Sequence, residues 1–252
     1  MKKALQKPGL TSYQLKWIAI IAMVIDHIGA VLYPGELPLR VIGRLSFPIF
    51  CFLLTEGFCH THDRRSYMLR LGGFALISEV PYDLTFHGNL LDLDQQNIFF
   101  TLLLGVLLLA MLEKSRHWLL KAAEIYLVMW AAEVVLRVDY GYEGILLICI
   151  FYLFRERIWV KTAGCICWNF LWENRLQAFG GFSVIPIMLY NGERGRNMKY
   201  FFYIFYPAHL LILHVIDVYC PGGGCCGIDV AYACHVSGHI ARAVEALTPY
   251  GA

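Results

Sequence analysis

The chain has 252 residues, of which 58% are apolar and only 16% are charged, and its formal net charge is +2. A soluble domain carries about 25% charged residues, because its whole surface must be hydrated. The composition therefore argues against a soluble enzyme, a disordered chain and a coiled coil, and the small net charge argues against nucleic-acid binding. It indicates an all-α protein that crosses a membrane several times, since only helices satisfy the backbone over long apolar runs in lipid.

Nine apolar runs follow one another, separated by short polar segments. They cover about residues 15–33, 41–59, 68–86, 97–112, 118–136, 143–154, 159–172, 176–190 and 200–218. A full span needs about 20 residues, so we expect the shorter runs to extend into their loops. We find no internal repeat and no soluble segment. The sequence therefore predicts one membrane domain over residues 1–218 and a Cys- and Gly-rich tail over residues 219–252.

The positive charges fall in every second loop. Sixteen of the 21 Lys and Arg residues share these alternate segments: Lys2, Lys3, Lys7, Lys16, Arg64, Arg65, Arg70, Lys114, Arg116, Lys121, Arg155, Arg157, Lys161, Arg194, Arg196 and Lys199. Cytoplasmic loops of membrane proteins carry such an excess. The pattern predicts nine spanning helices in a bacterial inner or plasma membrane, with the N-terminus in the cytoplasm and the tail outside. A tenth span in the tail stays open, although its polar content disfavours it.

Two ionisable residues, Asp26 and His27, lie within the first run. Such groups are costly at membrane depth, so they suggest function by default. Consecutive helical residues point about 100° apart, so one of the two could face a cavity and the other a neighbouring helix. Arg44 lies in the same outer half and could pair with Asp26. The sequence favours neither a structural nor a functional role for such a pair. Pro48 should bend the second run.

Further polar residues mark other runs. Glu56 lies near the inner end of the second run, and His60, Arg64 and Arg65 follow it. This basic cluster could bind the phosphates of a cytosolic cofactor, although the positive-inside rule alone would place Arg there. The later runs add Glu79, Asn97, Tyr206 and His209, with His214 as a weaker candidate base. Embedded His, carboxylate and Arg residues are typical of a reaction chamber or a proton-coupled transport path.

Eight of the nine cysteines fall into two groups. Cys51, Cys149, Cys165 and Cys167 lie inside apolar runs and are predicted to be small buried side chains. Cys220, Cys225, Cys226 and Cys234 lie in the tail, beside His235 and His239 at i, i+4 spacing. That spacing could ligate a metal, but we favour a peripheral helix with incidental His and expect no metal ion.

Several sequence blocks resemble the TraX family. They appear in order between about residue 15 and residue 213, and they read DHIG, GRLSFPIF, EGFCHT, RLGGFALISEVP and FYPAHL. The resemblance implies a polytopic membrane acetyltransferase; the namesake of the family acetylates the N-terminus of conjugative pilin. A more distant similarity is to the membrane acyltransferases that include lysosomal heparan-α-glucosaminide N-acetyltransferase, which take acetyl-CoA from the cytosol.

The resemblance leads to a hypothesis of acetyl transfer from acetyl-CoA to an unidentified amine or hydroxyl acceptor. Such a reaction needs a base, a donor for the oxyanion and positive charge for the CoA phosphates. His27 is the preferred base or a transient acetyl carrier, oriented by Asp26, and His209 is the second candidate. The other candidates are Arg44 and Glu56 for catalysis, and His60, Arg64, Arg65, Arg70, Asn97 and Tyr206 for the cofactor. Arg44, Asn97 or Tyr206 could polarise the thioester carbonyl.

Two other interpretations use the same residues. A proton-coupled transporter would relay protons through the buried Asp, Glu and His residues, although the absence of an inverted repeat in the sequence disfavours it. A structural partner in a larger membrane assembly would tolerate Asn and Gln at positions 26 and 27. Binding of CoA discriminates the enzyme from both.

Overall fold

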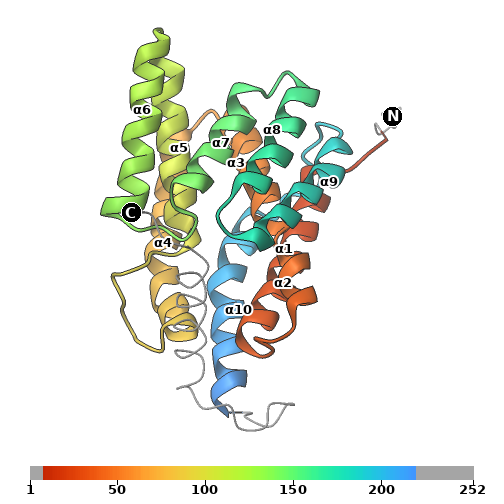
Figure 1. Ribbon diagram of the computed structural model, residues 1–252, viewed down its shortest axis with the longest axis vertical. Helices are drawn as coiled ribbons and strands as arrows, with labels where there is room; N and C mark the ends of the chain where they lie inside the picture. The colour runs from red at the N-terminus through yellow and green to blue at the C-terminus, as the bar shows by residue number, and fades with distance from the viewer. Residues whose placement is uncertain (1–7, 220–252) are drawn as a thin grey trace, which may run out of the picture.

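The computed structural model describes residues 8–219, and all regular structure in this part of the chain is helical (Figure 1). The helices are α1 (Ser12–Val31), α2 (Leu37–Gly43), α3 (Ser46–His60), α4 (Arg64–Phe86), α5 (Ile98–Lys114), α6 (Trp118–Trp130), α7 (Gly141–Leu153), α8 (Ile158–Leu171), α9 (Val184–Met188) and α10 (Lys199–Tyr219). A π-helical turn, η1 (Ala131–Val135), follows α6, and a 3-10 helix, η2 (Arg175–Ser183), precedes α9. The prediction of an all-α fold is confirmed.

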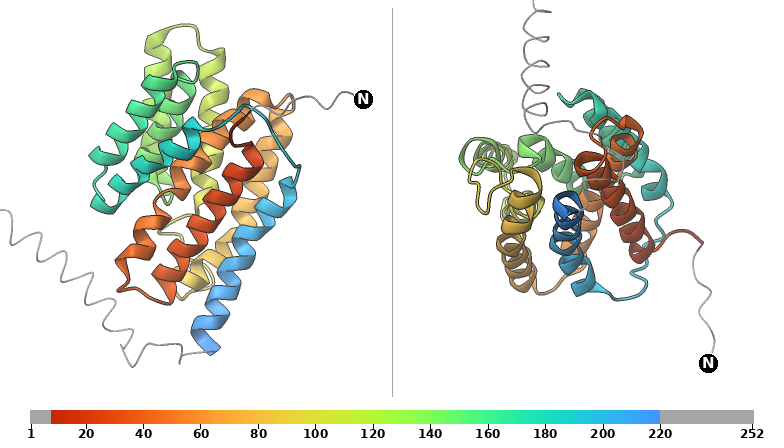
Figure 2. Two further views of the ribbon diagram at one scale, coloured as in Figure 1. Left: turned by 90° about the vertical axis from the view of Figure 1, so that its right-hand side faces the viewer. Right: turned by 90° about the horizontal axis from the view of Figure 1, so that it is seen from below.

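The long helices run in alternate directions along the long axis of the bundle, with α2 continuing into α3 in the same direction (Figures 1 and 2). The start of α1 and the connections 61–63, 115–117, 154–157 and 189–198 lie at one end, which we call the cation-rich end. It is named for Arg64, Arg65, Lys114, Arg116, Arg155, Arg157, Arg194 and Arg196 in and beside these connections. At the cation-rich end, backbone pairing of Leu10 with Tyr190 joins the segment before α1 to the segment after α9. At the opposite end, pairing of Gln96 with Val138 joins the loop before α5 to the loop before α7.

Three helical stretches within residues 8–219 are long and apolar enough to cross a membrane. They are Ser12–Val31, Leu37–His60 (α2 with α3) and Tyr200–Tyr219. The gathering of basic loops at one end agrees with the charge pattern of the sequence. Nine spans and a cytoplasmic N-terminus remain predictions.

The eighth run does not form the predicted spanning helix. Residues 176–190 fold instead as the 3-10 helix η2 and the five-residue α9. Gly180 and Gly181 weaken an α-helix here. The absence of a side chain at Gly180 also lets η2 pack closely on α8, since a Cβ there would overlap the Asn169 side chain. The segment still returns the chain to the cation-rich end, where Tyr190 meets Leu10.

The second run also differs from its prediction. It is interrupted at Arg44 and Leu45, between α2 and α3, and Pro48 lies in the first turn of α3. A proline there loses no helical hydrogen bond, because the first turn has no intrahelical acceptors for its N–H groups. The expected bend at Pro48 is therefore wrong, and the break lies before it.

Close helix contacts depend on small residues. A Cβ at Gly105 would overlap Ile148 of α7, and a Cβ at Gly144 would crowd Phe47 of α3. Helices in lipid associate through such close packing, because lipid tails are as apolar as the side chains. α5 and α3 are thereby held against α7.

Three of the four cysteines predicted to be buried are buried, namely Cys51, Cys149 and Cys165. Cys167 is exposed, so that prediction is wrong. Residues two apart on a helix point about 200° apart, and Cys167 therefore lies on the outer face of α8 while Cys165 faces the core. The cysteines, His235 and His239 of the tail lie outside the described residues.

Candidate functional site

Two cavities lie inside the bundle, toward opposite ends. Cavity 1, of about 570 Å³, reaches the end opposite the cation-rich end, and Asp26, His27, Arg40, Arg44, Asp139 and Tyr140 are among its lining residues. Cavity 2, of about 420 Å³, reaches the cation-rich end, with Lys16, Glu56, His60, Arg70, Arg194 and Tyr203 among its lining residues. Helices α1, α3, α4, α5 and α10 contribute to both cavities.

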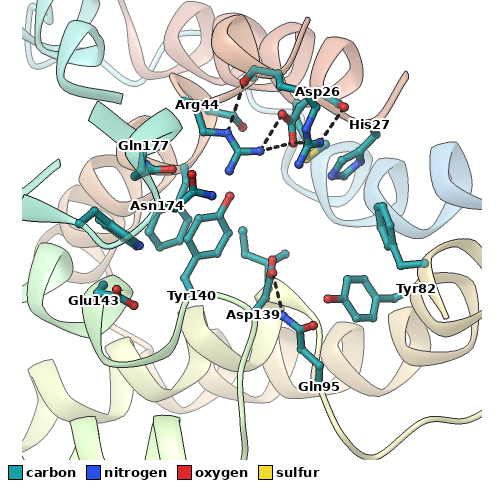
Figure 3. Close-up of a pocket in the computed structure, with 18 of the residues that line it drawn as sticks. Asp26, His27, Arg44, Tyr82, Gln95, Asp139, Tyr140, Glu143, Asn174 and Gln177 are labelled. Atoms are coloured by element: carbon teal, nitrogen blue, oxygen red, sulfur yellow. Dashed lines mark hydrogen bonds and ion pairs between the residues drawn. The ribbon is translucent and has the colours of Figure 1, made fainter. Parts of the chain in front are cut away.

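Asp26 forms the centre of an ion cluster on the wall of cavity 1 (Figure 3). Nη2 of Arg44 donates to both carboxylate oxygens of Asp26, at 2.8 and 2.9 Å. Nη1 of Arg40 lies 2.9 Å from Oδ2 and donates to the Asp26 carbonyl at 3.0 Å. The predicted pairing of Arg44 with Asp26 is therefore confirmed.

The ion cluster depends on a glycine between its two arginines. A Cβ at Gly43 would overlap the side chain of Asp26, so α2 can approach α1 this closely only because residue 43 has none. Arg40 and Arg44 are one helical turn apart and face the same carboxylate. Arg40 was not a site candidate from the sequence, although its i, i+4 spacing to Arg44 is a signal that could have found it.

His27 contacts His209 instead of Asp26. Nδ1 of His27 lies 2.7 Å from Nε2 of His209, and the two rings are parallel, with centroids 5.0 Å apart. Nδ1 of His209 donates to the Phe205 carbonyl at 2.9 Å. The prediction that Asp26 orients His27 is wrong, because the two side chains point in different directions from α1 and the carboxylate is held by the arginines.

Asp139 and Tyr140 face the ion cluster across cavity 1 (Figure 3). The Tyr140 ring stacks on Phe47 with centroids 3.6 Å apart, which fixes its position. Burial raises the pKa of Asp139 to about 6, against the opposing effect of the nearby Arg44 and Arg40 charges. Neither residue stood out in the sequence, since both lie in the short loop before α7.

A His–carboxylate pair lies where α4 ends. Nδ1 of His87, which lines cavity 1, is 3.4 Å from Oδ1 of the fully buried Asp83. Oδ2 of Asp83 accepts a hydrogen bond from the Asp92 N–H. This pair was not a sequence candidate, because both residues lie at the end of an apolar run, where polar residues are expected in any case.

Cavity 2 combines apolar walls with cations at its mouth. Lys16, Arg70 and Arg194 line it, and the positive charge of Arg194 is close enough to repel that of Lys16. Nε of Arg70 is buried and has no hydrogen-bond partner among residues 8–219. Three cations gathered in one cavity favour an anionic ligand. Of these cations only Arg70 was a sequence candidate for cofactor binding.

The remaining predicted residues divide between the cavities and the scaffold. Glu56 and His60 line cavity 2, away from His27, with Nδ1 of His60 3.9 Å from Oε2 of Glu56. Tyr206 lines both cavities. Arg64 forms an ion pair with Glu113 and lies over the Phe58 ring, so it does not line either cavity. Arg65 is exposed and likewise lines neither.

Asn97 caps α5 and lines neither cavity. Its Oδ1 accepts from the Phe99 N–H at 3.0 Å, while its Nδ2 donates to the Ala75 carbonyl at 2.8 Å and to Glu79. The side chain is completely buried. The structure thus assigns Asn97 and Glu79 to holding α5 against α4, which differs from the predicted contact with cofactor.

Comparisons with known proteins agree on one family. The family model described as TraX protein matches residues 11–217. A probable fimbrial assembly protein FimC of Dichelobacter nodosus is 30% identical over 81% of this chain and 94% of its own length. Protein TraX of Escherichia coli is 25% identical over 55% of this chain and 54% of its own length. No solved structure matches.

Proposed function

This chain belongs to the TraX family, and from that membership and the two cavities we propose that it is a membrane acetyltransferase. Acetyl-CoA binds in cavity 2, and an amine or hydroxyl acceptor enters cavity 1. The relative named for fimbrial assembly supports a fimbrial or pilus subunit as one acceptor to test. The observation that carries the proposal is the His27–His209 pair beside cavity 1.

The hydrogen bonds of this pair define its tautomers. A carbonyl only accepts, so the 2.9 Å contact with Phe205 requires a proton on Nδ1 of His209. Nε2 of neutral His209 then carries a lone pair and accepts from Nδ1–H of His27, 2.7 Å away. Nε2 of His27 is left without a proton. The backbone of α10 thus makes His27 a base at a defined atom.

The chemistry follows from that atom. Nε2 of His27 accepts a proton from the acceptor as its nitrogen or oxygen attacks the thioester carbonyl. The tetrahedral intermediate collapses by breaking the carbon–sulfur bond, and the same proton passes to the departing CoA sulfur. His209 is a positioning residue that stabilises the transient charge on His27 through Nδ1.

Arg44 is suited to stabilise the oxyanion. Its Nε donates to the Arg40 carbonyl and its Nη2 to Asp26, which leaves Nη1 as a donor on the wall of cavity 1. A donor that is already held in place stabilises developing charge without reorganising. Asp26 therefore acts through Arg44, and its role is to position that guanidinium.

Cavity 2 provides a site for the donor. Lys16, Arg70 and Arg194 supply charge for the CoA phosphates, and its apolar walls suit the uncharged arm. Lys16 and His27 are eleven residues apart on α1, which corresponds to about 16 Å along the helix axis. A donor with a long arm is needed to join a phosphate site and a base at this separation.

The test uses purified protein in detergent. Acetyl-CoA binding is measured by calorimetry. CoA release is followed by chromatography in two assays, first with water as the acceptor and then with a peptide that has a free amino terminus. Wild-type protein should bind acetyl-CoA with micromolar affinity and release CoA. His27→Gln should keep the affinity and lose about 10²- to 10⁴-fold in CoA release, the usual contribution of a general base.

His214→Gln is the matched control, because His214 lies on α10 and lines neither cavity. Its CoA release should equal that of wild type. Lack of acetyl-CoA binding by folded wild-type protein would refute the acetyltransferase proposal. Unchanged CoA release by His27→Gln would refute the assignment of the base.

A proton-coupled transporter is the second candidate, and one observation favours it: the cavities reach opposite ends of the bundle. Such a transporter has no reason to bind acetyl-CoA. Solute uptake into vesicles driven by a pH gradient, together with no heat of binding for acetyl-CoA, would support it over the enzyme.

A further inference from the structure

Three residues form a wall that the two cavities share. Met23 of α1, Ile98 of α5 and Tyr206 of α10 line cavity 1 and cavity 2, and they alone among the described residues line both. Met23 and Tyr206 are buried. We call Met23, Ile98 and Tyr206 the shared wall.

The shared wall separates the proposed base from the proposed phosphate site. His27 lines cavity 1 only, whereas Lys16, Arg70 and Arg194 line cavity 2 only. Among the described residues, the direct route from the cations of cavity 2 to His27 passes these three wall residues. This inference rests on the proposed function, in which cavity 2 binds acetyl-CoA and His27 is the base.

One face of α1 connects these points. Lys16, Ile20, Met23 and His27 follow each other at spacings of four, three and four residues, which places them on one helix face. Lys16 and Ile20 line cavity 2, Met23 lines both cavities, and His27 lines cavity 1. Met23 is thus one turn from His27, on the side from which the thioester arrives.

The surroundings change sharply at the shared wall. On the side of cavity 2 the neighbours include Ile20, Leu53, Leu54 and Phe99. On the side of cavity 1 they include the Asp26–Arg44–Arg40 ion cluster and Asp139. An acyl chain that extends past the thioester would lie among these charged groups and displace their water, which is unfavourable.

We propose that the shared wall, and Met23 in particular, selects donors by acyl length, so that acetyl passes and longer chains are rejected. The alternative is that a long chain rests in the apolar part of cavity 2. The two cases predict opposite trends. Burial of each added methylene in an apolar cavity strengthens binding about fourfold, whereas rejection at the wall weakens it.

The experiment measures dissociation constants of CoA, acetyl-CoA, butyryl-CoA and hexanoyl-CoA by calorimetry, with purified full-length protein. Wild type should bind hexanoyl-CoA at least about tenfold more weakly than acetyl-CoA. Met23→Ala should remove most of that difference. Ile20→Ala is the matched control, because Ile20 lies on the same face of α1 and lines cavity 2 only; it should change all four constants by a similar factor.

The arms of the experiment separate the two proposals. Failure of CoA and acetyl-CoA to bind would remove the acetyltransferase proposal and this inference with it. Binding of CoA together with affinity that rises about fourfold per methylene in wild type would overturn the selection by the wall and leave the acetyltransferase proposal standing. The wild-type series decides this even where a variant fails to fold.

Discussion

The two cavities are neighbours, yet they differ in almost every chemical respect. Cavity 1 is lined by an aspartate between two arginines, by His27 of the His27–His209 pair and by further carboxylates such as Asp139. Cavity 2 has aromatic and aliphatic walls with cations only toward its mouth. The difference teaches that a carboxylate can be buried deep in the bundle where cations offset its desolvation, as Arg40 and Arg44 do for Asp26 in cavity 1.

The largest expected effect breaks the ion cluster of cavity 1. Asp26→Asn leaves Arg40 and Arg44 without their common carboxylate, and we expect the free energy of unfolding to fall by about 3–5 kcal/mol. Unfolding in mixed micelles measures it. Asp94→Asn is the control, because the Asp94–Arg137 pair is exposed and such pairs contribute little.

The same variant separates the geometry found here from the arrangement predicted from sequence. Asp26→Asn should lower CoA release through Arg44 while leaving the midpoint of its pH profile unchanged, because His27 contacts His209. A shift of that midpoint equal to the loss of a neighbouring carboxylate would contradict the assignment of Asp26 to Arg44.

The second effect concerns the proton on Asp139. Its pKa is raised to about 6, so the folded protein holds this proton over a pH range in which the unfolded chain, with an ordinary value near 3.8, has lost it. Stability should therefore fall as pH rises from about 4 to about 6, by at most about 3 kcal/mol. Asp139→Asn should remove this decline.

Thermal unfolding of wild type and Asp139→Asn at several pH values measures the effect. The two curves should agree near pH 4 and diverge above pH 6, with the variant more stable. Parallel curves over the whole range would show that Asp139 has the same pKa in the folded and unfolded protein, and would contradict this prediction.

A smaller effect is expected at the mouth of cavity 2. Lys16→Gln should weaken acetyl-CoA binding about tenfold at low salt, since a charge-assisted contact with a phosphate is lost. The loss should shrink at high salt, where screening weakens the contact in wild type too. Arg65→Gln, which changes an exposed cation at the same end, should leave the dissociation constant unchanged; equal effects of both variants would indicate general attraction without a built site.

The smallest effect lies outside both cavities. Asn97→Ala removes the cap of α5 and should cost about 1 kcal/mol of stability, with no change in acetyl-CoA affinity once the protein is folded. Thermal unfolding and calorimetry on the same sample give both values. A tenfold loss of affinity would return Asn97 to the cofactor site.

The sequence predicted those features that depend on polarity along the chain. Apolar runs and alternating loop charge gave the helical fold and the cation-rich end, and the cost of charge in lipid identified Asp26, His27, Arg44 and His209. Pairing of Arg44 with Asp26 followed from their common depth. Each of these properties can be read from composition and position alone.

Features that depend on the rotation and breaking of helices could not be predicted in this way. The sequence places His27 beside Asp26, but the structure turns them to different partners from α10 and α2. Asn97 has the residue type of a ligand and serves as a cap, and the 176–190 run is apolar enough for a helix although packing on α8 shapes it as a 3-10 turn. Tertiary contacts decide each case.

The thinness of the shared wall has an electrical consequence. Where two hydrated cavities approach each other inside a membrane, most of the transmembrane voltage falls across the layer between them. In the predicted membrane arrangement that layer would be Met23, Ile98 and Tyr206. Moving one elementary charge through such a layer involves about 2.3 kcal/mol per 100 mV. In the proposed reaction the acetyl group is neutral and the CoA phosphates stay on one side, so the voltage would do no work on the group that crosses.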